Sequence, residues 1–157
     1  MKSRTPEYWI DKLNLERHTE GGYFREVYRK KADIQGRDLA TSIYYLLPSG
    51  EASKLHRLEN DEVWYYHHGA PLVLYFITPE GKAESYVLGP DIDQGHYLSK
   101  VIPAHTIFGA EVQDPDTFSL VSCNMSPGFD YQDFELMDRK NLLTLYPEYA
   151  EIIHKLT

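Results

Sequence analysis

Short stretches rich in Tyr, Val, Ile, Leu and Phe follow one another from Tyr23 to about Glu135, and this pattern constrains the fold more than any other feature of the chain. Turn-forming residues separate the stretches, for example at 48–50 and 79–81. The stretches that we predict as strands are 23–30, 40–47, 53–58, 62–68, 72–78, 83–88, 97–102, 106–112, 117–125 and 132–136. Many short strands separated by turns are typical of a β-sandwich or a β-barrel. We therefore expect a mainly β fold.

Helical patterns occur only at the two ends of the chain. Thr5 followed by Pro6 is typical of a helix N-cap with proline at the first helical position, which predicts a helix over 6–14. In the tail, 138–156, apolar residues recur at helical spacing and predict short helices. We expect both ends to pack on the outside of a barrel at about 20–136, and the whole chain, 1–157, to form a single domain.

Composition excludes several classes of function. The chain has 16 Lys and Arg against 24 Asp and Glu, a net charge of −8 with His neutral, so we expect no nucleic-acid partner. No apolar run approaches the roughly 18 residues of a membrane span. The N-terminus lacks the apolar core of a signal peptide, which predicts a cytoplasmic protein without a membrane partner. The single cysteine, Cys123, lies in an apolar strand, and we interpret it as a buried structural thiol.

The densest group of polar and aromatic residues lies between Gly50 and Gly69. If 53–58 and 62–68 are consecutive strands joined by a turn, His56 and Glu62 meet on one face. A carboxylate beside a histidine orients the imidazole and raises its basicity, so the pair is a candidate general acid–base group. Part of a metal site, or a structural pair at a polar barrel mouth, are the alternatives.

Tyrosine is unusually frequent, with 13 Tyr against 6 Phe and 2 Trp. Because side chains alternate along a strand, we predict that Tyr44 and Tyr66 face the pocket and that Tyr45 and Tyr65 face the other way. The same alternation predicts opposite directions for the two adjacent histidines at 67–68, which therefore cannot chelate one ion.

The segment around His56 resembles the first conserved motif of the cupin superfamily, Gly-x5-His-x-His-x3-Glu-x6-Gly. Gly50, His56, Glu62 and Gly69 match this motif, whereas Leu58 stands at its second histidine.

The second cupin motif would lie at 101–108. Pro103 matches its proline, His105 stands where a glycine is usual, and Phe108 stands where the last metal-binding histidine belongs.

Four ordered motifs make the chain similar to one branch, the cupin-5 family. They lie at 18–28, 41–47, 61–64 and 126–131, and the similarity spans residues 6–137. The resemblance implies a double-stranded β-helix (jelly-roll) barrel with short terminal helices and an open pocket. It also implies a homodimer, and it supplies no reaction.

Metal-binding cupins use three histidines and one glutamate, a ligand set suited to first-row transition metals. Here Leu58 and Phe108 replace two of the four ligands, and two hydrocarbon side chains make a poor metal site. We therefore expect no metal and no other cofactor. If a metal binds, His56 and Glu62 are the ligands to expect.

Two functional hypotheses follow. Metal-free cupin relatives include sugar-nucleotide epimerases, in which a histidine base removes a proton next to a carbonyl. The first hypothesis is a metal-independent isomerase or epimerase for a carbohydrate-like or carbonyl compound, with His56 as base and Glu62 as its orienting partner. The second is a non-catalytic module that binds a small ligand in the same pocket. A third reading, an interaction protein whose tyrosines line a dimer interface, describes assembly and is compatible with both.

Several residues are candidate ligand contacts besides the acid–base pair. Aromatic side chains would stack on the ligand or donate hydrogen bonds to it, and an arginine would bind an anionic group. The candidates are Arg25, Tyr44, Trp64, Tyr66 and His105. For Arg25 the alternative is an ion pair with a carboxylate such as Glu26. Few basic residues lie in pocket-forming motifs, so a heavily phosphorylated ligand is not expected.

Overall fold

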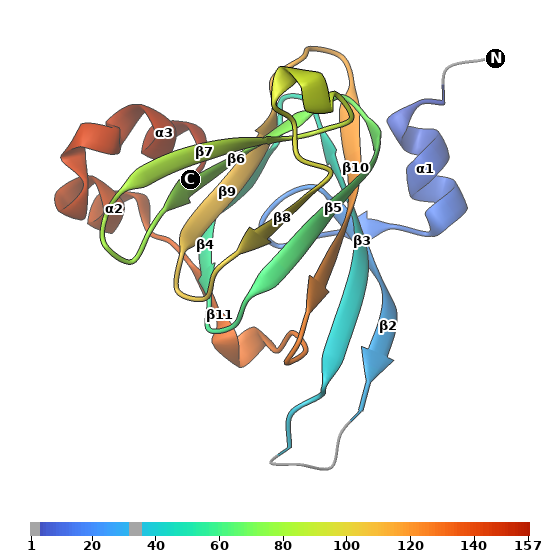
Figure 1. The fold of residues 1–157 in the computed structure, drawn as a ribbon, viewed down its shortest axis with the longest axis horizontal. Helices are drawn as coiled ribbons and strands as arrows, with labels where there is room; N and C mark the ends of the chain where they lie inside the picture. Colours follow the sequence, from blue (N-terminus) through green and yellow to red (C-terminus); the bar gives the residue numbers. More distant parts are fainter. Residues whose placement is uncertain (1–3, 32–35) are drawn as a thin grey trace.

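The computed structural model describes residues 4–31 and 36–157, and it contains two antiparallel β-sheets that pack face to face (Figure 1). Sheet A has the order β1 (Glu16–Arg17), β2 (Tyr23–Lys30), β3 (Ala40–Pro48), β10 (Phe118–Met125), β5 (Glu62–Gly69), β8 (Ser99–Ile102). Sheet B has the order β11 (Phe134–Leu136), β4 (Ala52–Leu58), β9 (Ile107–Val112), β6 (Leu72–Ile77), β7 (Ala83–Leu88). The predicted mainly β fold is confirmed.

Apolar side chains from both sheets form one core between them. Tyr45 and Trp64 of sheet A meet Leu74 and Phe108 of sheet B, and all four are almost fully buried. The Trp64 and Phe108 rings lie edge to face with centroids 6.2 Å apart. Since each fully buried large apolar side chain contributes about 1.5–3 kcal/mol, this core is the main source of stability.

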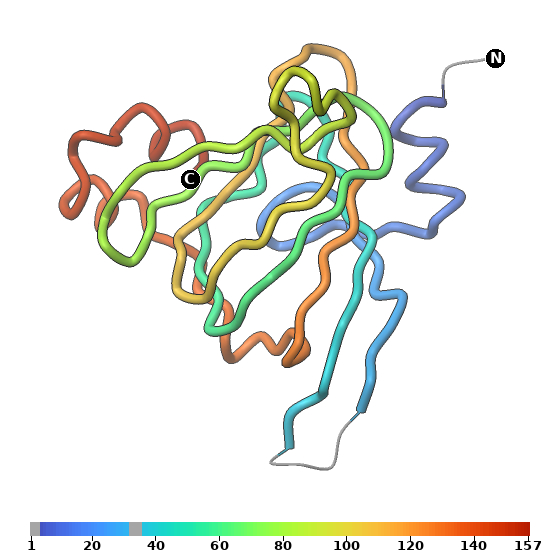
Figure 2. Tube along the Cα trace, in the orientation of Figure 1, coloured from blue at the N-terminus to red at the C-terminus, as the bar shows by residue number. Residues whose placement is uncertain are grey.

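Short helices at the chain ends cover the outer faces of the two sheets, as predicted (Figures 1 and 2). Helix α1 (Pro6–Leu13) is capped by the Thr5 side chain and packs against Leu46 and Leu120 of sheet A. Helices α2 (Arg139–Leu145) and α3 (Ala150–Lys155) follow sheet B and are separated by the 3-10 turn η3 (Pro147–Tyr149). They bury Leu142, Ile153 and Leu156 against Leu55, Ile77 and Ile107. Two further 3-10 turns are η1 (Ile92–Gln94) and η2 (Tyr131–Asp133).

Three strands carry one extra residue relative to their neighbour. In β2, Glu26 and Tyr28 pair with two adjacent residues of β3, so Val27 is the extra residue. In β4 Ser53 and His56 are three positions apart but pair with Ala110 and Phe108, which are two apart. In β5 His67 is inserted between residues that pair with adjacent positions of β10. Such bulges change which face the following side chains occupy.

The prediction for the tyrosines of β3 is wrong. Tyr45 is 1% exposed in the core, and its hydroxyl donates to the Gly21 carbonyl at 2.8 Å. Tyr44 lies on the outer face of sheet A, beside the residues that α1 covers. The side chains of β3 do alternate between the two faces. However, the sequence does not show which residues of β3 lie on the same face of the sheet as a given residue of β5.

The two adjacent histidines also differ from the prediction. His68 packs against Trp9 of α1, with ring centroids 5.2 Å apart, on the outer face of sheet A. His67 hydrogen-bonds the hydroxyl of Ser122, and its ring lies 6.1 Å from that of Tyr44. Both histidines therefore lie on the outer side, because the bulge at His67 interrupts the alternation.

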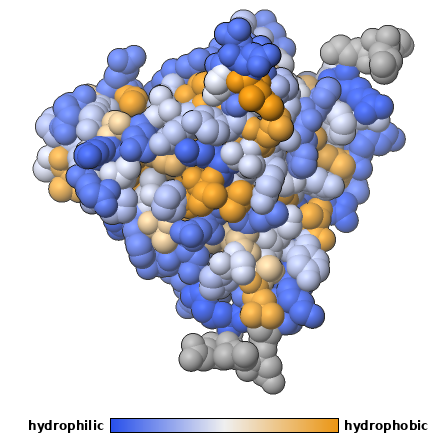
Figure 3. Space-filling view, viewed as in Figure 1, coloured by the Kyte–Doolittle hydropathy of each residue, from blue (hydrophilic) through white to orange (hydrophobic). Residues whose placement is uncertain are grey.

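Some large apolar side chains remain exposed on the surface. Ile92, Leu98 and Val101 are each at least half exposed, in η1, just before β8 and in β8. Figure 3 shows hydrophobic patches within a mostly hydrophilic surface on one face of the molecule. Within the described ranges, 4–31 and 36–157, we find no helix with the length and apolar character of a membrane span.

Candidate functional site

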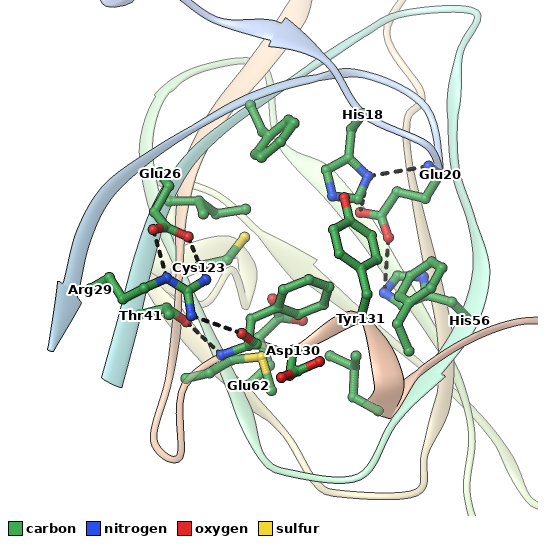
Figure 4. Close-up of a pocket in the computed structure, with 16 residues that line it drawn as sticks. His18, Glu20, Glu26, Arg29, Thr41, His56, Glu62, Cys123, Asp130 and Tyr131 are labelled. Carbon is green, nitrogen blue, oxygen red and sulfur yellow. Dashed lines mark hydrogen bonds and ion pairs between the residues drawn. The ribbon is translucent and has the colours of Figure 1, made fainter. Parts of the chain in front are cut away.

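A cavity of about 410 Å³ opens between the two sheets, next to η2. Strands β2, β3, β5 and β10 of sheet A and β4 of sheet B line it, together with the loop before β2 and residues 129–134 (Figure 4). This volume lies in the range of small-molecule sites.

Glu20 and His56 form a buried pair in the wall of this cavity (Figure 4). His56 Nε2 lies 3.1 Å from Glu20 Oε2, and both side chains are less than 10% exposed. The Ser53 hydroxyl donates to Glu20 Oε1 at 3.2 Å, and His56 Nδ1 lies 2.7 Å from the Lys54 carbonyl oxygen. The carboxylate partner of His56 is therefore Glu20, and the prediction that Glu62 orients this histidine is corrected.

The bulge in β4 builds the His56 side of the pair. It brings Ser53 and His56 to the same face, so both contact Glu20. The bulge also removes the Lys54 and Leu55 amides from the ladder with β9. These amides donate instead to the carbonyl oxygens of Glu20, at 2.9 Å, and Leu156, at 2.8 Å.

Two glycines allow the loop before β2 to deliver Glu20. Gly21 and Gly22 have φ of +110° and +73°, a region that favours glycine. A Cβ at Gly21 would collide with the carbonyl oxygen of Ala52, and one at Gly22 would lie 2.8 Å from that of Leu46. The loop therefore fits closely between β3 and β4, which fixes the position of Glu20.

The hydrogen bonds of His56 define how many protons the pair holds. The Lys54 carbonyl can only accept, so Nδ1 carries a proton. A hydrogen bond between Nε2 and Glu20 Oε2 then needs one further proton, on either atom. The pair is thus either a glutamic acid with a neutral imidazole, or a glutamate with an imidazolium.

Burial favours the uncharged arrangement. It raises the pKa of Glu20 to about 7, and it lowers the pKa of His56. Because both changes stabilise the neutral form of each group, the shared proton lies mainly on Glu20. A carboxyl with a pKa near 7 can release and regain this proton at neutral pH.

His18 supplies a second imidazole to the cavity. Its Nδ1 accepts a hydrogen bond from the backbone amide of Glu20 at 3.2 Å, so the neutral ring carries its proton on Nε2. Burial lowers the pKa of His18, which keeps the ring neutral. Its 3.9 Å approach to Glu20 Oε1 is therefore not an ion pair. His18 can act as a hydrogen-bond donor in the cavity wall.

Glu62 lines the same cavity, and Trp64 follows two residues later in β5. Glu62 is 8% exposed, and its buried Oε2 and the Trp64 indole nitrogen each lack a hydrogen bond of good geometry among the described residues. Burial raises the pKa of Glu62 to about 7, although His56 and the Trp64 side chain act in the opposite direction. Cys123, also in the wall, is buried as predicted, and burial raises the pKa of its thiol.

Arg29 closes one side of the cavity. The bulge at Val27 turns it inward, where it pairs with Glu26 through two hydrogen bonds of 2.8 and 2.7 Å. The same guanidinium donates to Asp38 Oδ2 at 2.7 Å and to the Phe129 carbonyl at 3.2 Å. Arg29 therefore ties β2 to the segment that covers the cavity.

The residues predicted as ligand contacts lie outside the cavity wall. Arg25 is exposed and donates to the Leu13 carbonyl at 3.2 Å, and Tyr44 is on the outer face. Trp64 lies in the core behind the wall, and the Tyr66 hydroxyl donates to the Gly69 carbonyl at 2.5 Å. His105 is exposed in a turn, 3.7 Å from Glu59. Of the predicted site residues, His56 and Glu62 line the cavity.

The residues that sequence reasoning missed are His18, Glu20 and Arg29. His18 and Glu20 belong to the first cupin-5 motif, so their place in a shared motif was the available signal. A backbone hydrogen bond from Lys54 to the Glu20 carbonyl holds this motif against β4, and no local pattern in the sequence encodes that contact.

The donor set does not fit the metal centre of metal-binding cupins. Leu58 lies in the cavity wall, and the Phe108 ring packs 4.1 Å from that of His56. Both nitrogens of His56 are engaged by Lys54 and Glu20. Across residues 4–31 and 36–157, no three His, Cys, Asp or Glu side chains are grouped as metal ligands.

Comparisons with known proteins agree with this architecture. The Cupin_5 family profile, described as "Cupin superfamily (DUF985)", matches residues 7–137. The chain belongs to the Cupin_5 family. A solved structure of this type, protein SO0799 from Shewanella oneidensis, is 42% identical, with a TM-score of 0.94 over 99% of this chain and 98% of that chain. A hypothetical protein from Leishmania major is 37% identical, with a TM-score of 0.90 over 98% of each chain.

A curated relative is the uncharacterized protein YML079W of Saccharomyces cerevisiae. It is 28% identical over 144 residues, which cover 79% of this chain and 71% of the yeast protein. The cupin-5 resemblance and the cupin fold predicted from the motifs are confirmed.

Proposed function

We propose that this Cupin_5 protein is a metal-independent isomerase or epimerase that acts on a small carbohydrate-like or carbonyl compound. The observation that carries the proposal is the Glu20–His56 pair, which holds one shared proton in the wall of a cavity of about 410 Å³. Isomerases of this kind move a proton to and from carbon next to a carbonyl, and they need a group whose pKa lies near the working pH. The pKa of Glu20, raised to about 7, meets this need.

In the reactive state the pair is a glutamate beside a neutral His56. Both nitrogens of His56 already take part in hydrogen bonds, whereas the Glu20 oxygens retain free acceptor positions. Glu20 therefore removes the proton from the substrate carbon, and His56 shares this proton through its hydrogen bond with Glu20. The electrons of the broken C–H bond move to the carbonyl and give an enolate, which is an enediolate where that carbon bears a hydroxyl group. His18 Nε2–H donates to the negative oxygen. In an isomerisation, Glu20 returns the proton to the neighbouring carbon on the same face, while the hydroxyl proton moves to the former carbonyl oxygen. In an epimerisation, a water molecule on the opposite face protonates the original carbon, and Glu20 loses its proton to solvent.

The test begins with a thermal-shift screen of sugars, sugar phosphates, keto acids and metals, since a ligand stabilises the folded protein by mass action. Each stabilising compound is then incubated with protein in D₂O, and NMR follows exchange of its carbon-bound protons. We expect exchange with the wild type and with Arg25→Ala, which alters an exposed residue outside the cavity. We expect none with His56→Ala or Glu20→Gln. Undiminished exchange in both of these variants would refute the proposal.

A non-catalytic ligand-binding module is the second candidate. It is favoured by the fact that the protein itself satisfies both nitrogens of His56, as in a purely structural pair. A compound that stabilises the wild type and shows no proton exchange would support this alternative.

A further inference from the structure

The apolar part of the cavity wall is continuous with the main hydrophobic core. Leu58 and Met125 belong to that core and are at most 5% exposed, and partly buried side chains that also line the cavity pack against it. The hydrocarbon side chains of the wall are Phe24, Ile43, Leu58, Met125, Phe129 and Phe134. The cavity is therefore an opening into the core, and a ligand inside it contacts hydrocarbon on several sides.

Hydrocarbon also surrounds the histidine of the acid–base pair. The centroid of the His56 ring lies 4.1 Å from that of Phe108 and 5.3 Å from that of Phe134. Phe134 lines the cavity, as does Leu58, which follows His56 on the same strand. The part of a substrate next to the reacting carbon therefore meets apolar side chains.

Several polar groups of the wall are already bonded to the protein. Arg29, the only Lys or Arg among the lining residues within 4–31 and 36–157, binds two carboxylates and the Phe129 carbonyl. The Thr41 hydroxyl accepts from the Phe129 amide at 2.9 Å. Two lining side-chain donors that have no protein partner in the described part of the chain are the His18 Nε2–H and the Tyr131 hydroxyl. The wall thus offers few hydrogen bonds to a ligand with many hydroxyl groups.

We propose that the substrate of this cavity is an apolar carbonyl compound, a small neutral ketone or aldehyde whose hydrocarbon part packs on Leu58, Met125 and Phe134. Its carbonyl oxygen accepts from His18 Nε2–H, and the carbon next to the carbonyl faces Glu20. Burial of hydrocarbon favours such a ligand, whereas a sugar in the same place would bury hydroxyl groups without partners, which is costly. The inference rests on the proposed function and narrows its substrate class.

The proton transfer on such a compound is complete within the site. Glu20 takes a proton from the carbon next to the carbonyl, and the electrons of that C–H bond move to the carbonyl and give an enolate. His18 Nε2–H donates to the enolate oxygen. In D₂O, Glu20 exchanges the proton for a deuteron and returns the deuteron to the same carbon, which restores the carbonyl group.

Two probes with the same ring isolate the effect of hydroxyl groups. Cyclohexanone is compared with 2-inosose, which is a cyclohexanone that carries a hydroxyl group on each remaining ring carbon. Calorimetric titration of the full chain measures both affinities, and NMR in D₂O follows exchange of the protons next to the carbonyl. We expect cyclohexanone to exchange these protons and to bind at least about tenfold more tightly, a factor that corresponds to about 1.4 kcal/mol.

Three variants test whether the wall sets this preference. Leu58→Asn and Met125→Gln each place an amide in the wall, on β4 and β10, with a side chain of similar size. Leu145→Asn is the matched control, because it makes the same change at a side chain that is 66% exposed outside the cavity. We expect the two wall variants to lose most of the preference for cyclohexanone and the control to keep it. Circular dichroism identifies the variants that are folded, and one folded wall variant is sufficient.

Three results would overturn the inference. They are binding of 2-inosose as tight as that of cyclohexanone, a preference that survives in a folded wall variant, and no binding of cyclohexanone by the wild type at millimolar concentration.

The failure of this inference differs from the failure of the proposed function. Binding of cyclohexanone that depends on Leu58, without proton exchange, supports the apolar site and contradicts the isomerase. Exchange on 2-inosose that depends on His56, with tighter binding than that of cyclohexanone, supports the isomerase and overturns the apolar site.

Discussion

Lys54 contributes to the site through its backbone, although its side chain is exposed. Its carbonyl accepts from His56 Nδ1, and its amide donates to the Glu20 carbonyl at 2.9 Å. The first bond sets the tautomer of the imidazole, and the second positions the residue that shares its proton. Any residue type can supply a backbone carbonyl or amide, so the sequence predicted His56 but not the backbone groups that set its protonation.

Glu62 makes stability depend on pH. Burial raises its pKa from 4.5 to about 7, so the folded state binds more protons than the unfolded state between these values. Its contribution to stability is therefore present below about pH 4.5 and is lost as the pH rises through 7. We expect Glu62→Gln to match the wild type near pH 4 and to exceed it by about 3 kcal/mol near pH 8. Urea denaturation across this range measures the difference, and parallel curves for the two proteins would contradict the assignment.

Leu58 and Phe108 lead to a prediction about metal content. Hydrocarbon side chains at two of the four cupin ligand positions cannot replace the water of a transition-metal ion. Protein purified without added metal should carry far less than one equivalent of Mn, Fe, Ni or Zn in elemental analysis. A stoichiometric amount of any of these metals would show that other side chains complete a site.

The strands were predictable because alternation and turn residues mark them locally. The predicted 23–30 and 62–68 correspond to Tyr23–Lys30 and Glu62–Gly69. The same reasoning placed His56 and Glu62 in one cavity.

The three bulges were not predictable by alternation, which assumes an uninterrupted period of two. One of them turns Arg29 inward, one brings Ser53 and His56 to one face, and one places His68 beside Trp9. Two of the three therefore build the candidate site. The bulges in β4 and β5 depend on pairing with β9 and β10, which are distant in the sequence.

The C-terminal helices stabilise sheet B by covering it. Ile153 is fully buried against Leu55 and Ile107, whereas Leu145 is 66% exposed. We expect Ile153→Ala to lower the free energy of unfolding by about 2–5 kcal/mol, because it removes buried contacts and leaves a cavity. Leu145→Ala should change it by at most about 0.5 kcal/mol. Denaturant titration compares the two variants, and equal effects would mean that α3 does not seal this face.

At the scale of the whole molecule, we propose that the protein is a homodimer. Two groups of exposed apolar side chains are candidate interfaces. One is Val27, Tyr28 and Leu39 in and beside β2 and β3, and the other is Ile92, Leu98 and Val101 near β8. Contiguous apolar surface is typical of a binding face. Light scattering should give twice the 18.3 kDa of one chain. Val27→Glu and Leu98→Glu would show which region is the interface, and a monomeric mass for the wild type would refute the proposal.

The bulge in β4 joins segments from opposite ends of the chain. Its two freed amides, those of Lys54 and Leu55, bind the carbonyl oxygens of Glu20 and Leu156. Contacts between residues so far apart in sequence form slowly, because long loops must close first. During synthesis from the N-terminus, β4 is available long before Leu156 leaves the ribosome. A nascent chain therefore contains Glu20 and His56 before it contains Leu156, whose carbonyl accepts the second of the amides that the bulge frees.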